Sequence, residues 1–262
     1  LTGRMTTRAL VEFYLDRIQR FDKTLASIIC VNPDAIRLAE ACDDYLKRTG
    51  KLKGNLYGVP VLVKDNIETA DMPTTAGSLS LEGFSTGKDA DLVRRLKDAG
   101  AIILAKTNLH EFAVWGESIS SIKGQTYNPY DLTRTPGGSS GGTGAALAAN
   151  FGLVGIGTDT INSIRSPSSA NNLVGIRPGS GLVSADGIVP YSLTQDTAGP
   201  MARFMADAAA VLEVIAVREM PEGAASGTTR IGVLKSFFGT EPVNAEVNKI
   251  MAGVMNELSE MG

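Results

Sequence analysis

The sequence is poor in the residues that build metal and disulfide sites. It contains two cysteines, Cys30 and Cys42, and one histidine, His110. So few ligands exclude a zinc site made of histidine and cysteine. Cys30 lies in an apolar, strand-like run and Cys42 in a predicted helix, so we expect two buried free thiols. A disulfide between them is the alternative, although the composition does not require an oxidising compartment.

The chain also lacks long apolar runs and a strong net charge. No apolar run approaches the ~20 residues that a membrane-spanning helix needs. The formal net charge of −3 provides no basic surface for nucleic acid or an anionic membrane. We therefore expect a cytoplasmic protein without nucleic-acid or membrane partners and without a cofactor or metal. The sequence gives no prediction of its oligomeric state.

Apolar runs typical of buried strands alternate with amphipathic helices. The runs VPVLV and AIILA, at 59–63 and 101–105, are typical of strands buried on both faces. Further β-like pieces lie at 26–31 and within 173–189. An irregular loop is expected over 69–87, and residues 116–136 are expected to be mostly loop. Helices are predicted at 7–21, 34–48, 89–99 and 206–217, with a short one at 108–115. This alternation predicts an α/β fold, in which ligands gather beyond the strand ends.

The C-terminal end of the sequence suggests a chain that continues. A strand-like run at 229–234 precedes an amphipathic helix at 243–261, and Gly262 stands where a C-cap glycine belongs. An α/β chain would normally return to a strand after such a helix. We therefore interpret residues 1–262 as a single domain that is incomplete at its C-terminus. Because the sequence starts at Leu1, a removed signal peptide cannot be judged.

The stretch 137–165 concentrates candidate functional groups. A Gly/Ser-rich turn, GGSSGG, leads into a helix of small residues, and a polar loop then ends at Ser163. The turn could serve tight packing alone, or it could cradle phosphate. However, no P-loop lysine follows the glycines, and the dinucleotide pattern is absent, so nucleotide binding is disfavoured. The hydroxyls of Ser139, Ser140 and Ser163 remain as candidate nucleophiles.

A serine nucleophile needs a base, and three residues could supply it. His110 is one candidate, with a surface histidine as the alternative interpretation. Lys64 and Lys106 each follow an apolar strand, and burial there would lower the lysine pKa enough to leave a neutral amine. Either lysine could instead extend its ammonium group into solvent. The residues alone leave the choice open.

Several motifs, in order, resemble those of the amidase signature family. GGSSGG, GTDT and SIRSP within 137–167 match its central pattern. GVPVLVKDN (58–66) and AKTNLHEFA (105–113) match motifs upstream of it. LVGIRPGSGLVS (173–184) and QDTAGPM (195–201) match motifs downstream. The resemblance covers roughly residues 6–217 and implies a mixed central β-sheet covered by helices on both faces.

The resemblance also implies an activity and the residues that perform it. Family members hydrolyse amides or transfer their ammonia through a Ser–Ser–Lys triad. On this chain the triad falls on Lys64 as base, Ser139 as proton bridge and Ser163 as the nucleophile that forms an acyl-enzyme. Lys106 then matches a motif lysine that is not the base. A cis peptide bond is implied at Gly138–Ser139.

The implied surroundings of the nucleophile come from two segments. Oxyanion and substrate binding fall on Thr160, Ile161, Asn162 and Ala113, and structural support of the loop falls on Asp159 and Arg165. The expected substrate is a small carboxamide. Two alternatives remain: a glutaminase subunit of a tRNA-dependent amidotransferase, which would need partner subunits, and a non-catalytic binding protein that retains the fold.

One departure from the family pattern lies next to the nucleophile. Ile161 and Asn162 replace two glycines that usually precede the nucleophilic serine. Glycine permits positive φ, whereas β-branched isoleucine does so poorly. We expect either ordinary φ or strain at Ile161, and a narrower acyl pocket rather than an inactive enzyme.

Overall fold

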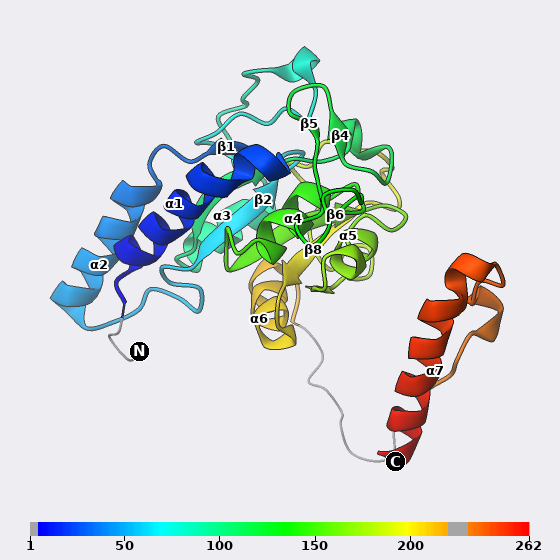
Figure 1. Ribbon diagram of the computed structural model, residues 1–262. Coiled ribbons are helices and arrows are strands. Elements are labelled where there is room, and N and C mark those ends of the chain that lie inside the picture. Colours follow the sequence, from blue (N-terminus) through cyan, green and yellow to red (C-terminus); the bar gives the residue numbers. More distant parts are fainter. Residues whose placement is uncertain (1–4, 220–229, 262) are drawn as a thin grey trace. The chain divides into compact units, whose positions relative to one another are not determined.

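The computed structural model describes residues 5–219 and 230–261 (Figure 1). The chain divides into two compact units, Leu1–Met220 and Pro221–Gly262, and each is described by itself. The interpretation of residues 1–262 as one domain stays a prediction. None of the helices in the described ranges is long and apolar enough to cross a bilayer.

The first unit is built on a mixed six-stranded sheet with the order β1-β3-β2-β6-β8-β7. The strands are β1 (Ile28–Val31), β2 (Pro60–Lys64), β3 (Ile102–Thr107), β6 (Val154–Asp159), β7 (Val174–Gly175) and β8 (Thr197–Ala202). The central strands β3, β2 and β6 run parallel, whereas β1, β8 and β7 pair antiparallel with their neighbours. A separate two-stranded ribbon joins β4 (Ile119–Ser120) and β5 (Gly124–Gln125).

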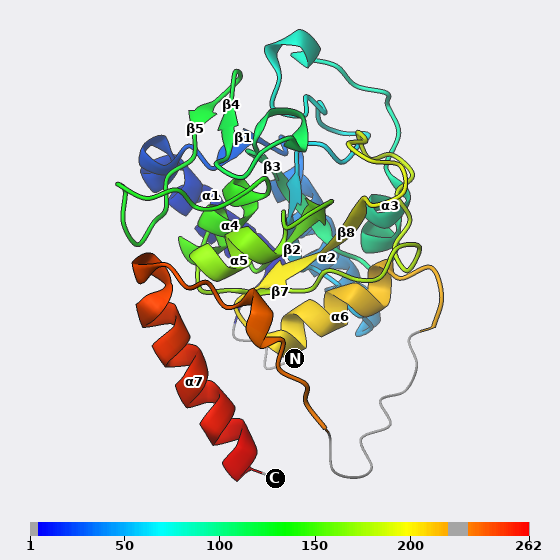
Figure 2. The same cartoon turned by 90° about the vertical axis from the view of Figure 1, so that its right-hand side faces the viewer.

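Helices cover both faces of this sheet, as predicted (Figures 1 and 2). On one face lie α1 (Thr7–Leu25), α2 (Ala35–Thr49) and α4 (Gly141–Ala148), with α5 (Arg165–Ala170) beside α4. On the other face lie α3 (Asp91–Asp98) and α6 (Met205–Ile215). The described part of this unit also contains the short 3₁₀ turns η1 (Leu79–Leu81) and η2 (Glu111–Ala113).

The alternation of side chains along β2 explains the two faces. Val61 and Val63 pack into the core beneath α3 and α6, whereas Leu62 packs into the core beneath α1, α2 and α4. All three side chains are fully buried. Each such side chain contributes roughly 1.5–3 kcal/mol through removal from water. A continuous apolar run is therefore what a strand between two helical layers requires.

Local signals mark the ends of α1 and α2. The Thr6 hydroxyl accepts a hydrogen bond from the Ala9 N–H at 3.1 Å, which caps α1. Gly50 ends α2 with φ +66°, a left-handed conformation that suits glycine. The N-cap of α2 is Asp34, and the Asn32 side chain accepts from the Asp34 N–H at 2.9 Å.

Two sequence predictions about elements are wrong. The helix expected at 108–115 is only the turn η2, because the Asn108 side chain bonds loop backbone and Phe112 takes φ +50°. The strand expected at 229–234 is absent from the described residues 230–234, since no described strand pairs with them. Conversely, the sequence does not predict β8, because TAGPMA contains glycine and proline, which both disfavour strands.

The second unit contains η3 (Lys235–Phe237), η4 (Pro242–Asn244) and α7 (Ala245–Glu260), which confirms the predicted C-terminal helix. None of its described residues is buried. Gly262, the expected cap, lies outside the described residues.

Candidate active site

The carboxyl ends of the three parallel strands meet at one edge of the sheet. Lys64 ends β2, Lys106 lies one residue before the end of β3, and Asp159 ends β6. In open α/β sheets this edge is where ligands bind. All three charged side chains are fully buried here, so each must find a polar partner.

Lys64 is surrounded by hydroxyl groups rather than carboxylates. Its Nζ lies 2.7 Å from Ser139 Oγ and 2.8 Å from Thr158 Oγ1. No carboxylate lies within ion-pair distance of it in the described residues. Burial lowers the pKa of Lys64 to about 7, against the opposing charges of Asp159 and Asp196. Lys64 is therefore able to be a neutral amine, and thus a base, near neutral pH.

The glycines around Ser139 let two segments approach closely. The Ser118 hydroxyl donates to the Gly137 carbonyl at 2.8 Å and accepts from the Gly141 N–H at 2.9 Å. A Cβ on Gly141 would lie 2.1 Å from this hydroxyl, so glycine is required there. The Gly138–Ser139 peptide bond is cis, which confirms the prediction. The turn thus holds Ser139 over the end of β2.

Ser163 lies on the loop that follows β6. Its carbonyl accepts the Ser140 N–H at 3.3 Å, which places the loop beside the Ser139 turn. Its hydroxyl makes no hydrogen bond to any described residue, and Ser163 keeps 8% of its surface exposed. The N–H groups of Ile161, Asn162 and Ser163 likewise donate to no described acceptor. Free backbone donors next to a free hydroxyl are what an oxyanion site needs.

Asp159 stabilises the loop that carries Ser163. Its carboxylate accepts the Ile164 N–H at 2.9 Å and pairs with Arg165 at 3.3 Å. Arg177 pairs with the other carboxylate oxygen at 3.2 Å. Burial would raise the pKa of Asp159, but Arg165 and the backbone donors together lower it. Asp159 therefore stays ionised and fixes the start of α5.

Several supporting residues were not predicted from the sequence. Thr158, Asp196 and Arg177 lie within matched motifs but were given no role, and Ser118 lies outside these motifs. Asp196 bonds the Thr160 hydroxyl and accepts the Tyr191 N–H at 2.7 Å, which ties the loop after β6 to the segment before β8. A polar residue within a matching motif was the available signal for Thr158, Asp196 and Arg177, whereas Ser118 had no such signal.

A cavity of about 370 Å³ opens in front of Ser163. Its walls are Ala113, Val114, Trp115, Gly116, Glu117, Thr160, Ile161, Asn162, Ser163 and Tyr191. The structure thus brings the predicted Ala113, Thr160, Ile161 and Asn162 together around the serine. Ile161 and Asn162 both take ordinary φ, so the loop is formed without left-handed strain at these positions. Ile161 is 68% exposed, at the cavity wall.

Lys106 and His110, the other two candidate bases, have surroundings that differ from those of Lys64. Lys106 Nζ lies 3.3 Å from Asp65 Oδ1 and donates to the Thr74 hydroxyl at 2.9 Å and the Pro73 carbonyl at 3.0 Å. His110 is half-buried, and burial lowers its pKa. Neither residue hydrogen-bonds a serine hydroxyl in the described part of the chain, so the geometry favours Lys64 as base.

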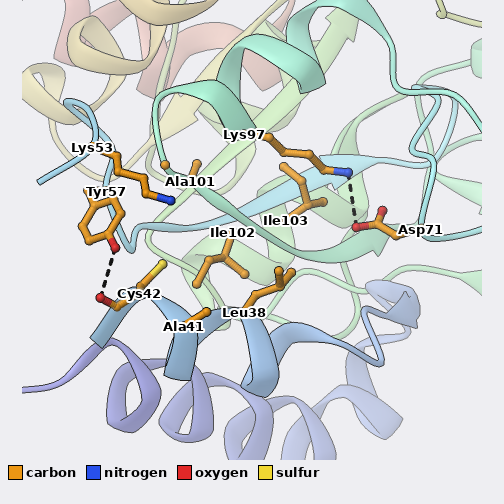
Figure 3. A pocket seen from close by; sticks show the side chains of 11 residues that line it. Leu38, Ala41, Cys42, Lys53, Tyr57, Asp71, Lys97, Ala101, Ile102 and Ile103 are labelled. Carbon is orange, nitrogen blue, oxygen red and sulfur yellow. Dashed lines mark hydrogen bonds and ion pairs between the residues drawn. The ribbon is translucent and has the colours of Figure 1, made fainter. Parts of the chain in front are cut away.

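A second cavity, of about 310 Å³, lies between α2 and β3 (Figure 3). It shares no lining residue with the first. Cys42 lines it, but burial raises the pKa of this thiol, which therefore stays protonated. Cys30 and Cys42 are both free but only half-buried, so the prediction of free thiols is confirmed and the prediction that they are buried is wrong.

This fold and this site define an α/β protein in which a buried lysine contacts a serine hydroxyl beside a cavity. The family model described as Amidase matches residues 9–262. The chain belongs to this family, the amidase signature family.

Individual relatives agree with this assignment. A probable amidase of Arabidopsis thaliana is 44% identical over 222 residues, which cover 81% of this chain and 43% of that protein. A glutamyl-tRNA(Gln) amidotransferase subunit of Corynebacterium diphtheriae is 40% identical over 254 residues, covering 89% of this chain and 51% of that protein. The native peptide amidase of Stenotrophomonas maltophilia superposes with a TM-score of 0.79 at 50% identity, covering 83% of this chain and 46% of that one. The chain spans about half the length of the relatives it matches.

Proposed function

We propose that this protein is an amidase that hydrolyses the C–N bond of a carboxamide through an acyl-enzyme on Ser163. The observation that carries this proposal is the 2.7 Å contact between Lys64 Nζ and Ser139 Oγ at a buried position where no described carboxylate lies within ion-pair distance of the lysine. The membership of the chain in the amidase family supports the same reaction class.

The acylation step begins with proton transfer. Neutral Lys64 accepts the Ser139 proton while Ser139 Oγ accepts the proton of Ser163. The Ser163 oxygen forms a bond to the amide carbonyl carbon, and the π electron pair moves to the carbonyl oxygen. The free N–H groups of residues 161–163 stabilise this oxyanion; loss of one such donor typically costs about 3 kcal/mol.

Collapse of the tetrahedral intermediate breaks the C–N bond. The proton held by Lys64 returns through Ser139 to the leaving nitrogen, which departs as ammonia or an amine. A water molecule then attacks the acyl carbon, with Lys64 and Ser139 again accepting its proton. The carboxylic acid leaves, and Ser163 regains its hydrogen.

The test compares two serines of the same loop–helix segment. We expect Ser163→Ala to reduce amide hydrolysis by about 10⁴-fold or more and to abolish labelling by a fluorophosphonate probe. Ser169→Ala is the control, because Ser169 is exposed and its side chain makes no hydrogen bond to a described residue. Labelling or hydrolysis that survives in Ser163→Ala would refute the proposal.

A glutaminase subunit of an amidotransferase is the second candidate, because relatives described as glutamyl-tRNA(Gln) amidotransferase subunits are 38–43% identical over most of the chain. Ammonia release from glutamine only in the presence of partner subunits would favour this function. Absence of both activities together with absence of labelling would instead indicate a binding protein that retains the fold.

A further inference from the structure

We propose that Glu117 makes the enzyme prefer amide substrates that combine an apolar chain or ring with a positively charged group, such as an alkylammonium. This inference rests on the proposed amide hydrolysis at Ser163. Among the residues that line the cavity in front of Ser163, Glu117 alone bears a formal charge. Ile161, Val114, Trp115 and Tyr191 supply apolar and aromatic surface around it.

The Glu117 carboxylate has no partner among the described residues. It makes no ion pair or hydrogen bond with any of them, and it is exposed. Its titratable neighbour is His110, whose pKa burial lowers, so this imidazole is neutral at pH 7 and above and does not neutralise the carboxylate. A cavity with one unpaired negative charge attracts cations and repels anionic substrates.

The backbone at Glu117 is held by hydrogen bonds and close packing, which limits the region that the carboxylate can reach. The Glu117 carbonyl accepts the Gln125 side-chain amide at 2.6 Å. On one side, Gly116 packs against Gly138, where an added Cβ would lie 2.8 Å from Gly116. On the other side, the buried Ser118 takes φ +59° and bonds the Gly137 carbonyl. The carboxylate is therefore mounted on a segment that packs directly against the turn that carries Ser139.

The apolar walls define the remaining part of the substrate. Val114, Trp115, Ile161 and Tyr191 are between 47% and 68% exposed, so they have apolar surface left to cover. A methylene chain or ring placed between Ser163 and Glu117 would cover it, while a terminal ammonium would meet the carboxylate. An amide with both features fits the cavity better than a neutral or acidic one.

The experiment uses pairs of amides that differ only in charge. 4-Aminobutanamide is compared with pentanamide, and 6-aminohexanamide with heptanamide, by kcat/KM at about pH 8.5, where an alkyl ammonium with a pKa near ~10.4 is protonated. We expect the protein to prefer the cationic member of at least one pair by about tenfold or more. Glu117→Gln should remove this preference, so that the cationic and neutral members of each pair have kcat/KM values within about twofold of each other. Added salt should weaken the preference in the parent protein.

Two further variants sharpen the result. Glu117→Lys should reverse the preference toward 5-carboxypentanamide, whereas Glu213→Gln removes an exposed charge of α6 outside the cavity and should change nothing. Equal kcat/KM for charged and neutral amides at both lengths, or a preference that survives in Glu117→Gln, would overturn this inference. If no amide is hydrolysed in a Ser163-dependent way, the proposed function itself fails, which is a distinguishable outcome.

Discussion

Two buried lysines at the ends of neighbouring strands have opposite environments. Lys106 meets a carboxylate, since Asp65 lies 3.3 Å away and itself accepts the Thr75 N–H at 3.0 Å. Lys64 meets only hydroxyl groups and a carbonyl. Both residues follow the same kind of apolar run, yet the counter-charge makes one a structural cation and leaves the other free to act as a base. Burial lowers the pKa of both lysines, and carboxylates oppose the shift in each: Asp159 and Asp196 from beyond ion-pair distance in Lys64, and Asp65 in direct contact in Lys106.

The register of the sheet produces this difference. Val63 pairs with Lys106 and Lys64 pairs with Thr107, so the two lysines point to opposite faces. Thr107 bonds Thr143 of α4 at 2.6 Å, and this is the face on which Ser139 lies.

Replacement of Lys64 is expected to have the largest effect and to separate activity from stability. Lys64→Met should lower kcat/KM by about 10³-fold or more, because no other described side chain hydrogen-bonds the Ser139 hydroxyl. The free energy of unfolding should change by less than about 1 kcal/mol, since methionine fills a similar buried volume without a charge. Amide hydrolysis and urea unfolding at pH 8 measure the two effects. If Lys64→Met retained its activity, Lys64 would not be the base.

The same replacement at Lys106 should act mainly on stability. Lys106→Met leaves Asp65 buried without its cation, so the free energy of unfolding should fall by about 3–5 kcal/mol. Lys106→Met/Asp65→Asn should recover part of this loss, because the uncompensated charge is then gone. Urea unfolding of both variants tests the pair. A stability equal to that of Lys64→Met would break the contrast between the two lysines.

The dependence of kcat/KM on pH is expected to be the smallest of these effects, but it tests the lowered pKa of Lys64 most directly. Because only neutral Lys64 accepts a proton, kcat/KM should rise about tenfold per pH unit below a midpoint near 7 and reach a plateau above it. Activity is therefore lost as pH falls through about 7. A midpoint near the ordinary lysine value of about 10.4 would show that burial does not lower the pKa as proposed.

Much of the fold was predictable because its signals are local. Continuous apolar runs predicted β2 and β3, and periodic ones predicted α1 and α6, within a few residues. The helix expected at 108–115 failed because the Asn108 side chain bonds backbone distant in sequence, at Ala26 and Gly124. The strand β8 has no such local signal, because pairing with β6, rather than intrinsic propensity, makes TAGPMA a strand.

The sequence by itself determined the alternation of buried strands and helices and, through its ordered motifs, the resemblance that implied Lys64, Ser139 and Ser163. From physical pattern alone, Lys64 and Lys106 were equivalent. Only the tertiary structure distinguished them, because the side a strand residue faces depends on its register against a neighbour far away in the chain. The same holds for Arg177 and Glu117, whose surroundings come from segments that only folding brings together.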